Sequence, residues 1–358
     1  MKALILAGGK GTRLKPLTNT ITKQLLPIAN RPILFYAIDQ IIEAGFNDLG
    51  IIISPETGAS VKEAVGDGSR WNTQITYILQ PEPLGLAHAV KTAQDFLGGS
   101  PFIMHLGDTL IQANLAPFVE QFKNIKPDAL ILLQEAQNTS VLRKVGVVQL
   151  NEKGEVISLE EKPGKPKDKF ALVGVYFFSS KIHQAITHLK PSWRGELEIT
   201  DAIQELINRG DEVQAHILEG WWLDTGKKDD LLEANRAILD RFLKQSVQGQ
   251  VDTKSSIVGR VEIRKGTKVE DSIVRGPVSI AEDCLIRNSF IGPFTSIGRG
   301  TKIEASSIEH SVILENCHIY CIERLADSLI GNGVELAKHG QKFRAIRLSV
   351  GDDAKIEL

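Results

Sequence analysis

Beyond about residue 250, aliphatic residues return at steps of about six along the chain. The steps run through Ile257, Ile263, Val269, Ile280, Ile286, Ile297 and Ile303. Short Ser-x-Ile and Ser-x-Val units recur among them, and glycines such as Gly259 and Gly276 separate the units. One strand-and-turn unit cannot bury its apolar face alone, whereas stacked copies can. The repeat therefore predicts a solenoid of stacked parallel strands.

Hexapeptide units of this type resemble those of left-handed parallel β-helices, with roughly three hexads in each coil. We expect this domain to cover residues 250–345, followed by a loose polar end at 350–358. A sandwich of short antiparallel strands is the alternative, and the six-residue step makes it the weaker interpretation.

The first 245 residues instead alternate between apolar runs of strand length and segments with helical periodicity. Strands are predicted at 3–7, 49–53, 75–79, 102–106, 130–133, 145–150, 156–159 and 172–178, and helices at 32–45, 86–97, 197–208 and 229–243. Such alternation predicts an α/β domain over 1–245, with a Rossmann-like, mixed or parallel sheet and helices on both faces.

Charge and cysteine content restrict the partners and the compartment of this chain. The 42 Lys and Arg residues nearly balance 44 Asp and Glu, so we expect no nucleic-acid partner. We expect no membrane span and no signal peptide, because the first apolar run is short and leads into glycines. The three cysteines, Cys284, Cys317 and Cys321, suggest no disulfide framework, which predicts a cytoplasmic protein.

The most specific chemistry lies near the amino terminus, in the signature segment (residues 6–27). A strand-like run ends in Leu-Ala-Gly-Gly-Lys-Gly-Thr-Arg-Leu, and Thr-Lys-Gln-Leu-Leu-Pro follows at 22–27. Glycine N–H groups can face phosphate oxygens, and Arg13 and Lys23 add positive charge. Neither the G-x-G-x-x-G fingerprint nor the Walker A pattern is present.

This segment resembles the signature of the sugar-1-phosphate nucleotidylyltransferases, in the thymidylyl-transferring form that carries a carboxy-terminal β-helix. The resemblance implies transfer of a thymidylyl group from dTTP to α-D-glucose 1-phosphate, giving dTDP-glucose and pyrophosphate. It also implies Mg²⁺ as the cofactor, and direct in-line attack of the sugar phosphate.

The resemblance also assigns site residues. Arg13 and Lys23 are the catalytic candidates. The nucleotide candidates are Leu6, Gly8, Gly9, Gly11, Thr12, Gln24, Gln80, Gly85 and Asp108. The sugar-phosphate candidates are Gly146, Glu161, Lys162, Val173 and Arg194.

The metal candidates are Asp108 and Asp224. Asp108 directly follows an apolar strand, where open α/β sheets place their ligands. Carboxylate oxygens suit Mg²⁺, and the family holds it with two distant aspartates. A turn or helix-cap role is the alternative for either aspartate alone.

Two substitutions and the β-helix leave alternatives open. Val145 stands where many relatives have tyrosine and Thr109 where many have asparagine, so the identity of the sugar stays open. The nearest alternative is the same reaction with UTP or with another sugar 1-phosphate. A second acyltransferase activity of the β-helix, or a non-catalytic regulatory role, is a further alternative. We expect a homo-oligomer, a trimer or a tetramer, because related β-helix proteins and thymidylyltransferases assemble in these ways.

Overall fold

The computed structural model describes residues 1–9, 11–19, 21–136 and 138–338, and the chain divides into two compact units. Unit 1 contains Met1–Lys10, Thr22–Leu25 and Ile33–Asp224, and unit 2 contains Gly11–Ile21, Leu26–Pro32 and Thr225–Leu358. The signature segment therefore contributes to both units. The domains expected at 1–245 and 250–345 stay a prediction, and their residues 339–345, like the end at 350–358, lie outside the described residues.

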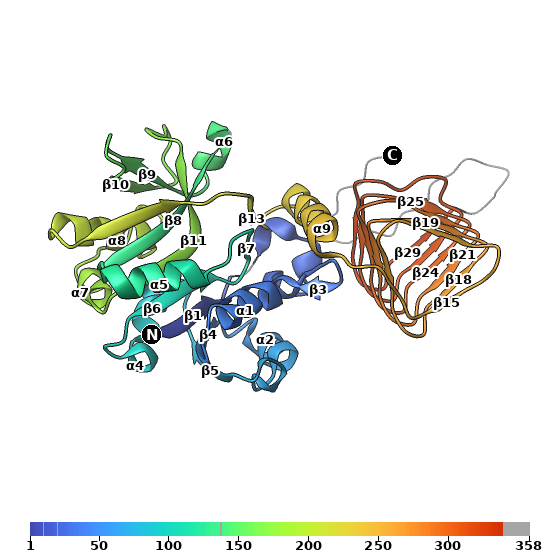
Figure 1. Ribbon diagram of the computed structural model, residues 1–358, viewed down its shortest axis with the longest axis horizontal. Helices are drawn as coiled ribbons and strands as arrows, with labels where there is room; N and C mark the ends of the chain where they lie inside the picture. The colour runs from blue at the N-terminus through green and yellow to red at the C-terminus, as the bar shows by residue number, and fades with distance from the viewer. Residues whose placement is uncertain (10, 20, 137, 339–358) are drawn as a thin grey trace. The chain divides into compact units, whose positions relative to one another are not determined.

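Unit 1 is built on a nine-stranded sheet (Figure 1). Seven strands follow the order β10 (Val156–Glu161), β9 (Gly146–Leu150), β11 (Phe170–Phe178), β6 (Phe102–Leu106), β1 (Lys2–Leu6), β4 (Asp48–Ile53) and β5 (Gln74–Leu79). β8 (Ala129–Glu135) pairs with β11, and β12 (Val213–Ile217) pairs with β8. The strands from β6 to β5 are parallel and β11 runs antiparallel to β6, so the mixed sheet is confirmed.

Helices cover both faces of this sheet, because successive side chains of a strand point to opposite sides. Ala3 and Ile5 of β1 lie in one hydrophobic core, and Leu4 and Leu6 lie in the other. The first core includes α1 (Ile33–Glu43), α2 (Gly58–Val65) and α5 (Ala116–Ile125). The second includes α3 (Leu86–Thr92), α4 (Gln94–Leu97), α7 (Lys181–Thr187) and α8 (Ile199–Asn208). The helix predicted at 86–97 is thus two helices, which meet at Ala93.

Unit 2 contains the predicted left-handed β-helix, whose three sheets consist of parallel strands (Figure 1). The first sheet stacks β14 (Ser246–Val247), β17 (Val261–Ile263), β20 (Val278–Ile280), β23 (Thr295–Ile297), β26 (Val312–Ile313) and β28 (Leu329–Ile330). The second stacks β15 (Gln250–Val251), β18 (Lys268–Glu270), β21 (Leu285–Arg287), β24 (Lys302–Glu304), β27 (His318–Tyr320) and β29 (Glu335–Ala337). The third stacks β16 (Ser256–Val258), β19 (Ile273–Arg275), β22 (Phe290–Ile291) and β25 (Ser307–Ile308).

The aliphatic steps of the sequence form the core of this β-helix. Ile263 pairs with Ile280, and Ile280 pairs with Ile297, all fully buried. Hydrogen bonds between neighbouring coils mostly join residues 17 apart, as between Ser289 and Ser272. A coil is therefore one residue shorter than three full hexads, and the six-residue step is only approximate.

Serines at one corner of the β-helix satisfy the backbone of the next coil. The Ser272 hydroxyl accepts from the Ser289 N–H at 3.0 Å, and the Ser289 hydroxyl accepts from the Ser306 N–H at 3.1 Å. The same hydroxyls donate to the carbonyls of Glu270 and Arg287 at 2.7 Å. Each serine hydroxyl thus hydrogen-bonds one backbone N–H and one backbone carbonyl at the turn. Such bonds stabilise the fold, because a buried polar group without a partner is costly.

Parts of the signature segment pack within unit 2. The hairpin of β2 (Pro27–Ile28) and β3 (Arg31–Pro32) contacts α9 (Lys228–Phe242). The buried Asn235 of α9 accepts from the Ala29 N–H at 2.9 Å and from the Ser296 hydroxyl at 2.7 Å. Asn30 donates to the Ser279 carbonyl at 3.0 Å. The hairpin is therefore hydrogen-bonded to both α9 and the β-helix.

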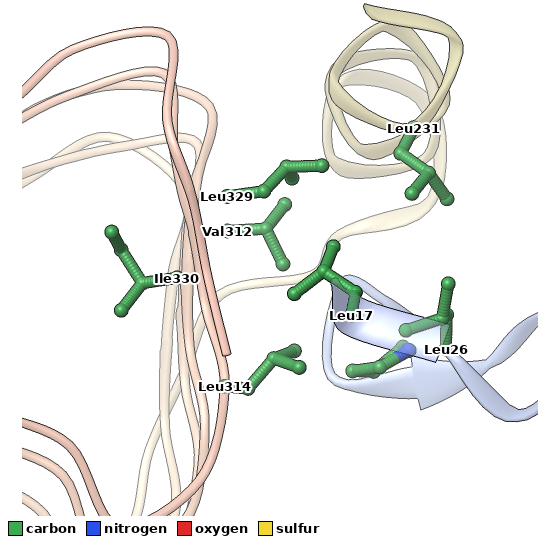
Figure 2. A pocket seen from close by; sticks show the side chains of 8 residues that line it. Leu17, Leu26, Leu231, Val312, Leu314, Leu329 and Ile330 are labelled. Carbon is green, nitrogen blue, oxygen red and sulfur yellow. The ribbon is translucent and has the colours of Figure 1, made fainter. Parts of the chain in front are cut away.

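An apolar pocket lies beside these contacts. Figure 2 shows Leu17 and Leu26 of the signature segment with Leu231 of α9 above them and side chains of the β-helix opposite. The β-helix contributes Val312, Leu314, Leu329 and Ile330. Leucine side chains from the signature segment therefore complete an apolar surface of unit 2.

Within the described part of the chain, no helix has the length and apolar character needed to cross a membrane.

Candidate active site

The carboxyl ends of β1, β4 and β6 meet at one edge of the unit 1 sheet, because these strands are parallel neighbours. The Gly107 N–H donates to the Leu6 carbonyl at 2.9 Å. A Cβ on Gly107 would lie 2.9 Å from that same oxygen, so a larger residue would push the two strand ends apart. Close approach of the strand ends brings the residues after β1 beside Asp108.

Lys23 lies between the two predicted metal ligands. Its Nζ is 2.5 Å from Oδ2 of Asp108 and 3.7 Å from Oδ1 of Asp224. The lysine side chain is 7% exposed and the two carboxylates are 23% and 36% exposed, so the cluster opens to solvent on the aspartate side. Residues more than 80 positions apart in sequence thus converge on one cation.

A short two-stranded sheet brings the two aspartates to the same place. β7 (Thr109–Ile111) runs antiparallel to β13 (Trp222–Asp224), with Thr109 opposite Asp224. Thr109 itself is 3% exposed, and a Cβ on Gly174 would lie 3.0 Å from its Oγ1. This threonine therefore packs tightly beside the aspartates.

Two polar residues that the sequence analysis missed support β7 from behind. The Gln40 side chain donates to the carbonyls of Ile111 and Ala113 at 3.0 and 3.2 Å. The fully buried His105 contacts Gln40 Oε1 through Nε2 at 3.3 Å. Burial lowers the pKa of His105 to about 4, so its ring is neutral near pH 7. A polar residue inside the apolar run 102–106 was the sequence signal for this pair.

Glycines line the path of the chain after β1. A Cβ on Gly9 would lie 3.1 Å from Nε2 of Gln24, and one on Gly8 would lie 3.7 Å from Oε1 of Gln80. Gln24 is 1% exposed, and no described residue hydrogen-bonds its Oε1. Gln24 and Gln80, both predicted to bind the nucleotide, therefore lie beside the glycine loop.

Gly85 holds the loop that follows Gln80 against the segment before α8. Its φ is 103°, in the left-handed region, and a Cβ there would lie 2.8 Å from the Leu197 nitrogen. The Gln80 amide donates to the Gly85 carbonyl at 3.2 Å. Only glycine fits this position. Its own carbonyl oxygen accepts the hydrogen bond from the Gln80 side chain.

The predicted sugar-phosphate residues form a second cluster around Glu161. Its carboxylate lies 3.3 Å from the Lys162 ammonium and 3.9 Å from the Arg194 guanidinium. A Cβ on Gly146 would lie 3.3 Å from Oε2 of Glu161, so this glycine leaves room beside the carboxylate. Burial raises the pKa of Glu161, and the two cations oppose that shift. The cluster combines an acceptor for hydroxyls with two anion-binding groups.

Glu198 and Thr200 belong to this second cluster, although the sequence analysis missed both. Arg194 donates to the nearly buried Glu198 at 3.1 Å, and the Thr200 hydroxyl donates to Glu161 at 3.4 Å. The spacing of Arg194 and Glu198, four residues apart, was the available signal.

Three predicted residues stand apart from the side-chain clusters. Val173 is 1% exposed within the hydrophobic core, so its side chain faces away from any ligand. Thr12 and Arg13 are exposed and belong to unit 2, in the 3₁₀ turn Thr12–Leu14 after Gly11. Their positions are accordingly described only within that unit.

The described residues hold no group of three or more His, Cys, Asp or Glu side chains that could together bind a metal ion. Cys317, whose neighbours in sequence are His318 and Cys321, is buried in the β-helix core. The carboxylates of Asp108 and Asp224 are the pair that meets a cation at the ends of the parallel strands.

The candidate site lies at the carboxyl ends of parallel strands, and the sequence profile described as nucleotidyl transferase matches residues 2–241. The chain belongs to the nucleotidyl transferase family.

Curated relatives match over the whole chain. A protein of Streptomyces griseus named glucose-1-phosphate thymidylyltransferase is 43% identical, covering 100% of this chain and 99% of the relative. A protein of the same name from Streptomyces antibioticus is 44% identical, with the same coverage. A crystal structure of a Bacillus anthracis protein assigned as a glucose-1-phosphate thymidylyltransferase superposes with a TM-score of 0.63 at 35% identity, covering 69% of this chain and 97% of that one.

Proposed function

We propose that this enzyme transfers a thymidylyl group from dTTP to α-D-glucose 1-phosphate, forming dTDP-glucose and releasing pyrophosphate. The observation that carries the proposal is the convergence of Asp108 and Asp224 on the Lys23 ammonium at the strand ends. Full-length relatives that bear the thymidylyltransferase name support the choice of substrates.

The residues of this chain divide the work among three regions. Gln80 and Gln24 read the base beside Gly8 and Gly9. Within unit 1, Lys23 and the backbone N–H groups of Gly8 and Gly9 after Leu6 bind the phosphates, and Lys23 stabilises charge on the departing pyrophosphate. Gly11, Thr12 and Arg13, in unit 2, keep the phosphate-binding role that the sequence predicts.

The sugar phosphate occupies the cluster around Glu161. The Glu161 carboxylate accepts hydrogen bonds from sugar hydroxyls, and Lys162 and Arg194 hold the sugar's phosphate. Gly146 and the backbone at Val173 leave room for the ring. An oxygen of that phosphate forms a bond to the α-phosphorus of dTTP while the bond to the pyrophosphate oxygen breaks. No covalent enzyme intermediate is needed, because positioning and electrostatics supply the catalysis.

Asp108 and Asp224 fit a magnesium ion. They supply two carboxylates that already converge on one cation and are partly open to solvent, and Mg²⁺ prefers a few carboxylates with phosphate and water oxygens. When bound, the ion would neutralise phosphate charge during transfer. Lys23 lies against the same carboxylates, so it carries the positive charge of the site within unit 1.

A substrate panel tests the function. The purified protein with Mg²⁺ is offered dTTP, UTP, dCTP, GTP or ATP against glucose, galactose and N-acetylglucosamine 1-phosphates, and pyrophosphate release is followed. We expect the highest kcat/KM for dTTP with glucose 1-phosphate. No turnover with any pair would overturn the enzyme proposal, whereas a preference for UTP would change the nucleotide only.

We also propose that the enzyme is a cytoplasmic homo-oligomer, either a trimer or a tetramer. The cysteines of the described chain, Cys284, Cys317 and Cys321, are unpaired, which suits a reducing compartment. Size-exclusion chromatography with light scattering measures the assembly, and a monomer at micromolar concentration would overturn that part of the proposal.

A further inference from the structure

The Gln80 side chain is held by two partners on its nitrogen side. Gln80 follows β5 and is 9% exposed. Its Nε2 lies 3.2 Å from the Gly85 carbonyl oxygen and 2.9 Å from Nδ1 of His88, which is on α3. Both partners belong to the loop and helix directly after Gln80, within unit 1.

The Gly85 carbonyl determines which way the amide points and which proton His88 carries. A carbonyl oxygen can only accept a hydrogen bond, so the Gln80 atom facing it must be the NH₂ group. The second hydrogen of that group then points at Nδ1 of His88, which must also accept. A His88 ring that accepts through Nδ1 is neutral and carries its proton on Nε2.

The opposite side of the amide is the side that meets a base. With both hydrogens of Nε2 used, Gln80 has only Oε1 left to offer. A Cβ on Gly8 would lie 3.7 Å from this oxygen, so Oε1 faces the glycine loop. Gln80 and Gly8 also line one surface cavity, together with Ser54, Pro55, Glu56, Pro81 and Pro83.

We propose that His88 is a positioning residue for nucleobase selection: its neutral Nδ1 holds the Gln80 amide so that only a carbonyl oxygen meets the base. That oxygen accepts from the imide N3–H of thymine or uracil. Cytosine presents a lone pair at N3, and two facing acceptors repel each other. The inference rests on the proposed role of Gln80 in reading the base, and it adds the residue that selects the imide.

Protonation of His88 opposes this arrangement. An Nδ1–H would face the Gln80 NH₂ group, so the two donors would compete, and the amide would turn to present its nitrogen to the base. Because the neutral ring is the form that base reading requires, acid weakens binding of dTTP. Burial, with the positive charge of Lys91, lowers the pKa of His88, while Glu82 raises it slightly.

Of the charged groups on the elements that pack against α3, Asp95 of α4 and Asp201 and Glu205 of α8 are not among those that shift the His88 pKa, and the nearby cations have partners of their own. Lys181 of α7 pairs with Asp128 and Asp211. In the segment before α8, Arg194 pairs with Glu196 and Glu198. These pairs leave Lys91 and Glu82 as the charges that act on the His88 ring.

Two variants and a pH series test the inference on the full-length protein. His88→Leu removes the acceptor, whereas His88→Asn keeps an acceptor that does not titrate. For each protein we measure kcat and KM for dTTP and dCTP at about pH 8 and at about pH 5.5. A melting curve in each case confirms that the variant is folded.

We expect His88→Leu to lower the preference for dTTP over dCTP by at least about tenfold, mainly through KM, with kcat for dTTP little changed. His88→Asn should keep the preference. The wild-type KM for dTTP should rise at the lower pH more than that of His88→Asn does.

Two results would overturn the inference. One is a folded His88→Leu protein with the wild-type preference for dTTP over dCTP. The other is a wild-type KM that follows the pH dependence of His88→Asn. If the wild-type protein shows no preference between dTTP and dCTP at pH 8, the proposed nucleotide is wrong instead, so the two failures are distinct.

Discussion

The two compact units bury polar groups in different ways. In the β-helix the buried hydroxyls repeat from coil to coil, as in the ladder of Ser272, Ser289 and Ser306, and each one satisfies backbone groups. In unit 1 the buried polar side chains do not repeat, and some of them have partners of their own, such as His105 with Gln40. The repeated serines therefore serve the fold, whereas the single pair of His105 and Gln40 supports the candidate site.

The β-helix core contributes stability, whereas the aspartates of unit 1 contribute the proposed chemistry. Ile286 is stacked between Val269 and Ile303, so its contribution is that of any core residue in a regular array. Asp108 and Asp224 are partly exposed and face the same ammonium. Substitutions in the two regions should therefore change different observables, and the predictions below follow that division from the largest effect to the smallest.

Asp108→Asn and Asp224→Asn should each lower kcat by about 1,000-fold, equivalent to about 4 kcal/mol, with an unchanged melting temperature. Loss of a carboxylate removes a ligand that Mg²⁺ needs but little packing. Steady-state kinetics at saturating Mg²⁺ make the measurement. The matched control is Asp95→Asn, at an exposed position of α4, which should behave as wild type. Near-normal turnover in either site variant would remove that aspartate from the metal site.

Ile286→Ala should destabilise the β-helix by about 3 kcal/mol, because the cavity lies in a fully buried stack. The chain's tryptophans, Trp71, Trp193, Trp221 and Trp222, lie in unit 1, so their fluorescence reports that unit alone. Far-UV circular dichroism should show the β-helix of the variant unfolding at a lower temperature than that of the wild type, before the tryptophan transition of unit 1.

The matched control for this variant is Ile273→Ala, at a position 46% exposed on the neighbouring sheet. Ile273→Ala should lower the free energy of unfolding by well under half as much as Ile286→Ala does. Because parts of the signature segment pack in unit 2, activity should be lost with the β-helix transition. Activity that instead persists up to the tryptophan transition would contradict this dependence.

Asn235→Ala should cost unit 2 about 2 kcal/mol, because it leaves the Ala29 N–H and the Phe294 carbonyl without their partners. The hairpin of β2 and β3 loses its hydrogen bond to α9. Because this hairpin follows Gln24 in the chain, the KM for dTTP should rise as well. Denaturation followed by circular dichroism and steady-state kinetics provide the two readouts. The exposed Asn208→Ala should change neither, and an equal effect of both substitutions would refute a specific role for Asn235.

His105 predicts a smaller, pH-dependent effect on unit 1. Its pKa of about 4 in the fold lies below the ordinary value near 6.5, so the unfolded chain binds the proton first as the pH falls. Stability is therefore full above about pH 6.5 and falls towards pH 4, by about 2 kcal/mol between pH 7.5 and pH 5.

Urea unfolding followed by tryptophan fluorescence measures this loss. His105→Gln should lose about 2 kcal/mol less than wild type over the same interval, whereas the exposed His188→Gln should show the full wild-type loss. Identical pH slopes for all three proteins would show that His105 does not carry the effect.

Periodicity predicted most of the regular elements and missed several short ones, among them α7 and β7. The six-residue step predicted the β-helix, and apolar runs predicted strands such as β1, β4 and β6. Helix α2 was missed because only Val61 and Val65 of its aliphatic residues reach the core. β12 was missed because it lies at the end of a branch of the sheet and is half exposed. Elements with one or two buried residues leave too weak a pattern to detect.

The sequence by itself determined the family, the parallel coils and the identity of the charged residues, because these depend on local spacing and on a contiguous motif. The tertiary structure alone decided which distant groups meet. It joins Lys23 to Asp108 and Asp224, pairs Arg194 with Glu198 beside Glu161, and places His88 against the Gln80 amide. These contacts depend on where strands end and how loops return, and no short-range pattern encodes that geometry.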